Sequence, residues 1–221
     1  MGFLSRLFGG KNAELVDRIW MNGAAKMADL VERTKQCAAA GQYPLTIYHF
    51  QETGEEVRAE FERQGISCGM VQFFDTVRGS GLDHWRSLGD TLLIKADNLP
   101  DPAGGGRRKP SGEGAISVHL AELYPLKSGD EPVLHLAEIL PGNLEFTGFV
   151  ALDEPWLQSF GVERIKKLLE QMDVDEGEML SHSLISRSLD NAREKIEAGV
   201  QVESKADSCA EWMRLNYRES G

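Results

Sequence analysis

The sequence lacks the short motifs that mark several common enzyme classes. It contains no Gly-x-x-x-x-Gly-Lys-Ser/Thr loop for holding phosphates and no Gly-x-Ser-x-Gly turn for presenting a nucleophilic serine. None of its 5 histidines lies four residues from another, the spacing of a helical metal site. We therefore expect no catalytic residue, no cofactor and no metal ion.

Cysteine and positive charge are also scarce. The 3 cysteines (Cys37, Cys68 and Cys209) are too few and too irregularly spaced for a disulfide framework or a zinc site, which favours reduced thiols in the cytoplasm. With 24 basic against 35 acidic residues, the formal net charge is -11. Such a chain repels nucleic-acid phosphates, so nucleic acid is not an expected partner.

Long hydrophobic runs are missing as well, so neither a signal peptide nor a membrane span is expected. The segment 1–11 does place four apolar residues on one face of a short helix: Phe3, Leu4, Leu7 and Phe8. It predicts docking on the protein itself, on a partner, or weakly on a membrane surface.

Hydrophobic residues make up 41% of the chain, enough for a core, and strand and helix patterns alternate along it. Gly41 and Gly65 are expected to end helices. The predicted helices are Asn12–Ala40 with a break at Asn22-Gly23, Glu52–Gln64, Asp83–Leu88, Pro155–Phe160, Val162–Met172 and Leu184–Val200. The predicted strands are Tyr43–Phe50, Ile66–Phe74, Thr91–Ala96, Ile116–Tyr124 and Glu145–Leu152, and Val133–Leu140 fits either a strand or a short helix.

This order predicts an α/β fold, in which helices form layers on both faces of a mostly parallel sheet. We expect an α/β domain over 12–160 and a helical C-terminal region over 161–221. The glycine- and proline-rich stretch Leu99–Gly114 is predicted to be a loop. It contains the one tight basic cluster, Arg107, Arg108 and Lys109.

The C-terminal third resembles a known family. In Ala151–Gly161 an acidic pair, Asp153-Glu154, opens a short helix that ends in Phe-Gly, and Asp190–Lys195 is an acid-Asn-Ala-basic run at the start of a long helix. Together with the helix between them, these segments resemble SecA, the preprotein-translocation motor. The likeness is to the end of its second ATPase lobe and the start of its scaffold helix, and it is specific over Phe149–Glu197.

A weaker likeness extends upstream, through Lys26 and the Gly41-Gln42 turn. Leu92–Asn98 stands where the family has a strand leading into an Asn-containing nucleotide loop, which makes Asn98 a weak candidate for nucleotide contact. The resemblance implies a RecA-like, P-loop-NTPase-like fold.

The nucleotide chemistry of that family is not matched by these residues. In SecA the second lobe supplies an arginine that stabilises charge on the transferred phosphoryl group. The corresponding stretch here, Lys127–Phe149, contains no arginine. Only Arg107, Arg108 and Lys109 remain as weak candidates for phosphate contact.

Three functions stay open at this point. The first is a non-catalytic SecA-like domain in the cytoplasm that binds a protein partner or another copy of itself. The second is a half-site that completes a partner's ATPase, with Arg107 or Arg108 as the arginine finger. The third is a small-molecule domain with its ligand at the carboxyl ends of the strands. Asp153 and Glu154 are expected to cap a helix start, and the four tryptophans to pack in or near the core.

Overall fold

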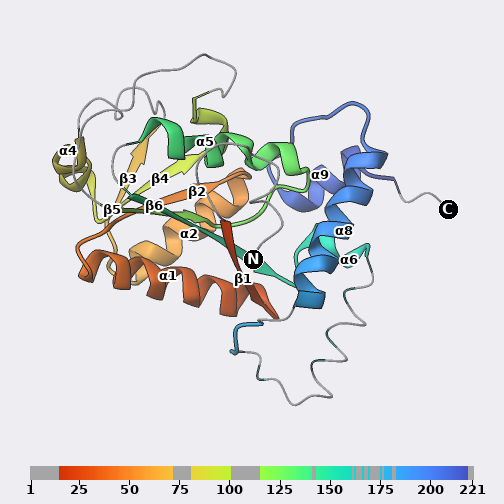
Figure 1. The fold of residues 1–221 in the computed structure, drawn as a ribbon, viewed down its shortest axis with the longest axis horizontal. Helices are drawn as coiled ribbons and strands as arrows, with labels where there is room; N and C mark the ends of the chain where they lie inside the picture. The colour runs from red at the N-terminus through yellow and green to blue at the C-terminus, as the bar shows by residue number, and fades with distance from the viewer. Residues whose placement is uncertain are drawn as a thin grey trace.

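The computed structural model describes residues 15–71, 81–100, 115–140, 143–160, 162, 166, 169, 175, 177–180 and 183–218. Helices and strands alternate over most of this length (Figure 1). The strands are β1 (Leu15–Trp20), β2 (Tyr43–Tyr48), β3 (Cys68–Val71), β4 (Thr91–Lys95), β5 (Ala115–Leu120) and β6 (Asn143–Ala151). The α-helices are α1 (Gly23–Ala39), α2 (Gln51–Arg63), α4 (Gly81–Leu88), α5 (Glu131–Ile139), α6 (Pro155–Gln158), α8 (Ser183–Gly199) and α9 (Cys209–Asn216), with short 3-10 helices η2 (Ala96–Asn98) and η4 (Lys127–Asp130).

The six strands form one sheet in the order β1-β6-β5-β2-β4-β3, and every neighbouring pair is parallel. The predicted α/β class with a mostly parallel sheet is therefore confirmed. From β2 the chain continues to β3, toward one edge of the sheet, whereas from β5 it continues to β6, toward the opposite edge. The strand order thus reverses between β2 and β5, and open α/β sheets bind ligands outside the carboxyl ends of the strands at such a point.

Helices α1 and α2 cover one face of the sheet, with Val31, Val57 and Phe61 in a core beneath them. The side chain of Asn22 accepts a hydrogen bond from Ala25 N at 2.9 Å and so begins α1. As expected, both helices are followed by glycines with positive φ, Gly41 at 78° and Gly65 at 73°.

A larger core lies on the other face, where α4 packs against β3 and β4. It contains Trp85 of α4 and Val133 and Leu136 of α5, all buried. The same cluster continues past the carboxyl edge of the sheet to Ile196 of α8 and Trp212 of α9. Figure 1 shows α6, α8 and α9 grouped at that end of the sheet.

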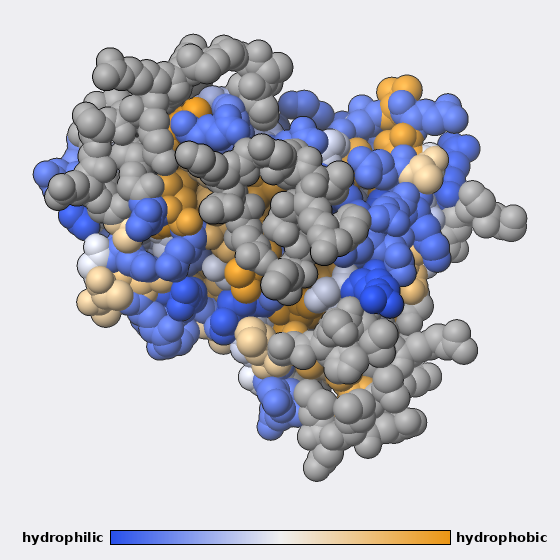
Figure 2. All heavy atoms as spheres, viewed as in Figure 1, coloured by the Kyte–Doolittle hydropathy of each residue, from blue (hydrophilic) through white to orange (hydrophobic). Residues whose placement is uncertain are grey.

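Helix α8 packs by one apolar stripe at helical spacing, because Ile185, Leu189, Ala192 and Ile196 are all buried. On the face drawn in Figure 2, the described surface around α8 is mainly hydrophilic. All four tryptophans are buried, as expected.

One predicted element is wrong. The residues before Asn22 were expected to be helical, but Leu15–Trp20 forms the edge strand β1, paired in parallel with β6 from Leu15↔Phe146 to Trp20↔Ala151. Its β-branched and aromatic residues suit a strand, and the hydrogen-bonding partner that selects it lies about 130 residues away in the chain.

The remaining predictions hold to within a few residues at their ends. Val133–Leu140, which fitted either type, lies in helix α5, where Pro132 occupies the first turn. Of the predicted helix Val162–Met172, the described residues Val162, Lys166 and Leu169 are helical. The segment 1–11, residues 72–74 of the second predicted strand and almost all of the loop Leu99–Gly114 lie outside the described residues.

Candidate functional site

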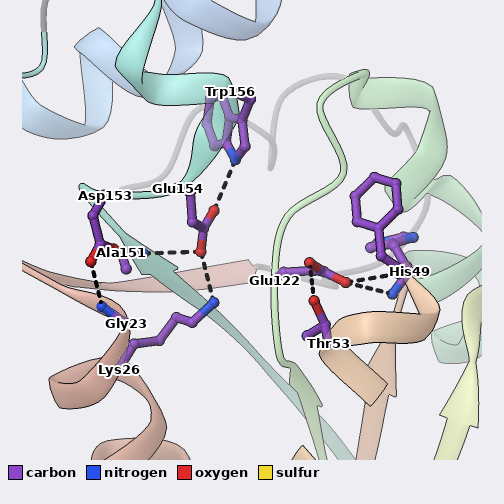
Figure 3. A network of polar contacts seen from close by, with 10 residues as sticks. Gly23, Lys26, His49, Thr53, Glu122, Ala151, Asp153, Glu154 and Trp156 are labelled. Atoms are coloured by element: carbon purple, nitrogen blue, oxygen red, sulfur yellow. Dashed lines mark hydrogen bonds and ion pairs between the residues drawn. The ribbon is translucent and has the colours of Figure 1, made fainter. Parts of the chain in front are cut away.

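Glu122 occupies the point where the strand order reverses. It follows β5, and its Oε1 accepts hydrogen bonds from the backbone amides of His49 at 3.0 Å and Phe50 at 2.9 Å. Its Oε2 accepts one from Thr53 Oγ1 at 2.7 Å (Figure 3). A carboxylate of the protein itself therefore holds the N-terminus of α2, a position that attracts anions because free amides and the helix dipole meet there.

Lys26 of α1 approaches the same edge from the other side. Its Nζ lies 2.8 Å from Glu154 Oε1, and both side chains are 11% exposed. Glu154 also accepts hydrogen bonds from Ala151 N at 3.1 Å and Trp156 Nε1 at 2.8 Å (Figure 3). Burial acts to lower the pKa of Lys26, but Glu154 and Glu122 together outweigh it and raise this pKa, so the ammonium stays charged.

The acidic pair was expected to cap the helix that it opens, and this expectation is wrong. No side chain caps α6 at Glu154. Asp153 Oδ2 instead accepts from Gly23 N at 3.1 Å, at the start of α1. Because the end of β6 lies beside the start of α1, the pair joins two segments that are 130 residues apart in the chain.

These groups border a cavity of about 410 Å³. Its walls come from the first turns of α1, α2 and α9 and from the segments after β5 and β6. The lining residues are Gly23, Lys26, Met27, Glu52, Thr53, Glu56, Glu122, Ala151, Asp153, Glu154, Pro155, Cys209 and Ala210. Burial raises the pKa of Glu122, and Lys26 and His49 oppose that effect.

A buried ionic network fixes α8 to the same end of the sheet. Arg193 Nη2 lies 2.5 Å from Asp130 Oδ2, and His49 Nε2 lies 2.8 Å from Asp130 Oδ1. Each of the three side chains is less than 5% exposed. Burial acts to raise the pKa of Asp130, but Arg193 and His49 outweigh it and hold this pKa below its usual value. Arg193 belongs to the acid-Asn-Ala-basic run, so this run docks the helix on η4, the segment between β5 and α5.

Asp17 of β1 is half-buried, and its buried Oδ1 has no hydrogen-bond partner among the described residues. Burial raises its pKa to about 7, with Arg193 opposing the shift and Asp130 and Asp190 adding to it. The folded state therefore binds a proton that the unfolded chain releases near its ordinary value of 3.8, and stability falls as the pH rises through that window.

We expect Asp17→Asn to increase the free energy of unfolding by about 1–2 kcal/mol at pH 8 and to change it little at pH 4. Urea unfolding at the two pH values measures this difference. Asp83→Asn, which changes an exposed residue of α4, is the control and should show no such dependence. An equal effect of Asp17→Asn at both pH values would contradict the assignment.

The structure also places a cysteine beside a histidine. Cys37 Sγ lies 3.8 Å from His119 Nε2 and 3.3 Å from Ser117 Oγ. All three side chains are buried under α1, at most 2% exposed, and burial lowers the pKa of His119 to about 3. The group has no access for a substrate and is a polar part of the core.

Of the site residues expected from the sequence, Asn98 is the one that the structure describes. Asn98 is half-buried in η2 at the end of β4 and does not line the cavity. Arg107, Arg108 and Lys109 lie outside the described residues, as do Phe3, Leu4, Leu7 and Phe8. His119 lies in β5, whereas His135 lies in α5, 3.3 Å from Glu138.

Sequence reasoning missed Glu122 because it sits at the end of an alternating strand pattern with nothing to mark it as a cap. The available signal was topological: a polar residue directly after a buried strand lies at the carboxyl edge of the sheet. Over the part of the chain that the structure describes, no group of three or more His, Cys, Asp and Glu residues could hold a metal ion. No helix there is both long and apolar enough to cross a bilayer.

Partial structural likenesses to helicase structures were found. The helicase domain of Pyrococcus furiosus Hef matches 61% of this chain and 27% of its own, with 17% identity and a TM-score of 0.37. The C-terminal domain of a possible DNA helicase from Lactobacillus plantarum matches 62% and 77%, with 11% identity and a TM-score of 0.35. No family model matches the chain.

Sequence relatives are more specific. The SecA translocase subunit of Christiangramia forsetii is 42% identical over 57 residues, and that of Cytophaga hutchinsonii is 40% identical over 57 residues. The subunit of Pelobacter propionicus is 36% identical over 58 residues. Each match covers 26% of this chain but only 5–6% of the relative. About a quarter of this α/β protein is therefore a SecA-related segment.

Proposed function

We propose that this protein is a non-catalytic, SecA-related domain that binds a protein partner in the cytoplasm and serves protein translocation. The position of Glu122 is the main observation that supports a non-catalytic role. Its carboxylate accepts hydrogen bonds from the two backbone amides just before α2, those of His49 and Phe50, and from the Thr53 hydroxyl in the first turn of the helix. Those donors are the ones that a phosphate would need at the reversal point of the sheet.

The sequence supports the same proposal independently. The chain has no P-loop motif and no arginine between Lys127 and Phe149, where the SecA resemblance would place the arginine finger. The cavity edge is also acidic, which repels the triphosphate of a nucleotide. The alternative of a half-site that completes a partner's ATPase depends on Arg107 or Arg108.

The proposed binding of a protein partner is supported by the way α8 is packed against the rest of the protein. The buried contact between Arg193 and Asp130 holds the SecA-like helix in a defined position against η4, which lies between β5 and α5. A chain that keeps this docking without the nucleotide chemistry retains a shape that a partner can recognise. Fold alone does not decide function, so a direct measurement is required.

We expect isothermal titration calorimetry with ATP and Mg²⁺ to show no saturable binding. The same titration into a SecA translocase subunit is the positive control. Micromolar affinity of this chain for ATP would refute the proposal. The partner role predicts saturable binding of the fluorescently labelled chain to a purified translocation component, measured by anisotropy.

A further inference from the structure

The cavity at the carboxyl edge of the sheet has a distinct chemical character. Its volume of about 410 Å³ lies within the range of small-molecule pockets. It also occupies the place in the fold where open α/β sheets bind ligands. Its lining is not that of a nucleotide site, however, and the side chains on its walls indicate which ligand it takes.

Anion-binding groups at this cavity are already engaged within the protein. Asn22 and Asp153 accept from the first turn of α1, and Glu122 accepts at the start of α2. Ser208 Oγ accepts from Glu211 N at the start of α9. Lys26, the ammonium in the lining, is paired with Glu154.

Carboxylates dominate the lining, which holds five of them and one ammonium group. Two of the five, Glu52 and Glu56, lie one turn apart on the exposed side of α2. The backbone amide of Glu52 donates to Asp207 O at 3.0 Å, but neither carboxylate forms a hydrogen bond or ion pair with another described residue. Met27 and Pro155 add apolar surface. An apolar wall beside free carboxylates suits an alkyl chain that ends in a positive charge.

We propose that this cavity binds an organic cation, an alkylammonium or guanidinium group that reaches Glu52 and Glu56. Two sources share this chemistry: a small polyamine, or a lysine or arginine side chain of a partner protein. If the cation belongs to a partner protein, the inference rests on the proposed function and extends it, because a lysine or arginine side chain is then the group that the partner inserts into this cavity.

The test is calorimetric titration of the full chain with spermidine and, separately, with the acetylated, amidated tripeptide Lys-Arg-Lys. We expect saturable binding of at least one probe. The double variant Glu52→Gln/Glu56→Gln should weaken it about five- to tenfold, from the loss of two charge contacts. The matched control is Glu55→Gln/Glu62→Gln, which removes the same charge from the same helix away from the cavity.

Tighter binding of spermidine than of the tripeptide indicates a small-molecule ligand, and the reverse order indicates a partner chain. The inference is overturned if neither probe saturates at millimolar concentration, or if both double variants weaken binding equally. ATP with Mg²⁺ is titrated in the same series. Micromolar ATP affinity refutes the proposed function, whether or not spermidine or the tripeptide binds. If ATP does not bind and neither cationic probe binds, only this inference is overturned.

Discussion

Replacing Arg193 with methionine should lower the free energy of unfolding by about 3–5 kcal/mol, because it leaves the buried Asp130 carboxylate without its cation. Asp130 is 2% exposed and lies between Arg193 and His49. Methionine keeps much of the arginine's length and apolar volume, so the loss reports mainly on charge. Equilibrium unfolding in urea at pH 7 measures it.

The control is Arg187→Met in the same helix, where the side chain is exposed, and a change within about 0.5 kcal/mol is expected. The pH dependence adds a second readout. The lowered pKa of Asp130 means that its contribution is present at neutral pH and is lost as the pH falls through the folded-state pKa. In the variant Asp130 protonates more easily, so the difference between the two proteins should narrow in acid. A difference that stays constant with pH would show that packing and not charge is responsible.

Glu122→Ala is expected to cost about 2–4 kcal/mol, since it removes three hydrogen bonds to one charged acceptor at the start of α2. The amides of His49 and Phe50 are buried within the junction of β2 and α2 and would lose their partner. Urea unfolding measures the loss, and hydrogen exchange should show faster opening of the first turn of α2.

The variant Glu122→Gln keeps a hydrogen-bond acceptor at this position but removes the negative charge. The amide oxygen can still accept from both backbone amides, so this variant should lose about half as much as alanine. Glu55→Ala, at an exposed position of the same helix, is the control and should change stability by about 0.5 kcal/mol or less. Equal losses for alanine and glutamine would mean that the charge, not the pair of hydrogen bonds, holds the helix start.

Much of the fold could be predicted because sequence patterns within single helices and strands indicate them. Tyr43–Tyr48 is a continuous run of buried residues bounded by turns, and α2 combines a stripe through Val57 and Phe61 with a glycine stop at Gly65. These signals lie within one element and need no partner. The apolar stripe of α8 likewise lies within one element, and the resemblance of the C-terminal third to SecA agrees with the SecA relatives that match about a quarter of the chain.

By itself, the sequence determined the α/β class, most of its helices and strands, the acidic balance and the absence of a P-loop motif. Only the tertiary structure decided that Leu15–Trp20 is a strand, that Glu122 fills the start of α2 and that Arg193 is a buried ion-pair partner. The physical reason is the same in each case. Hydrogen bonds and ion pairs between segments that are tens of residues apart determine these roles, and a side chain's own neighbours in sequence do not reveal them.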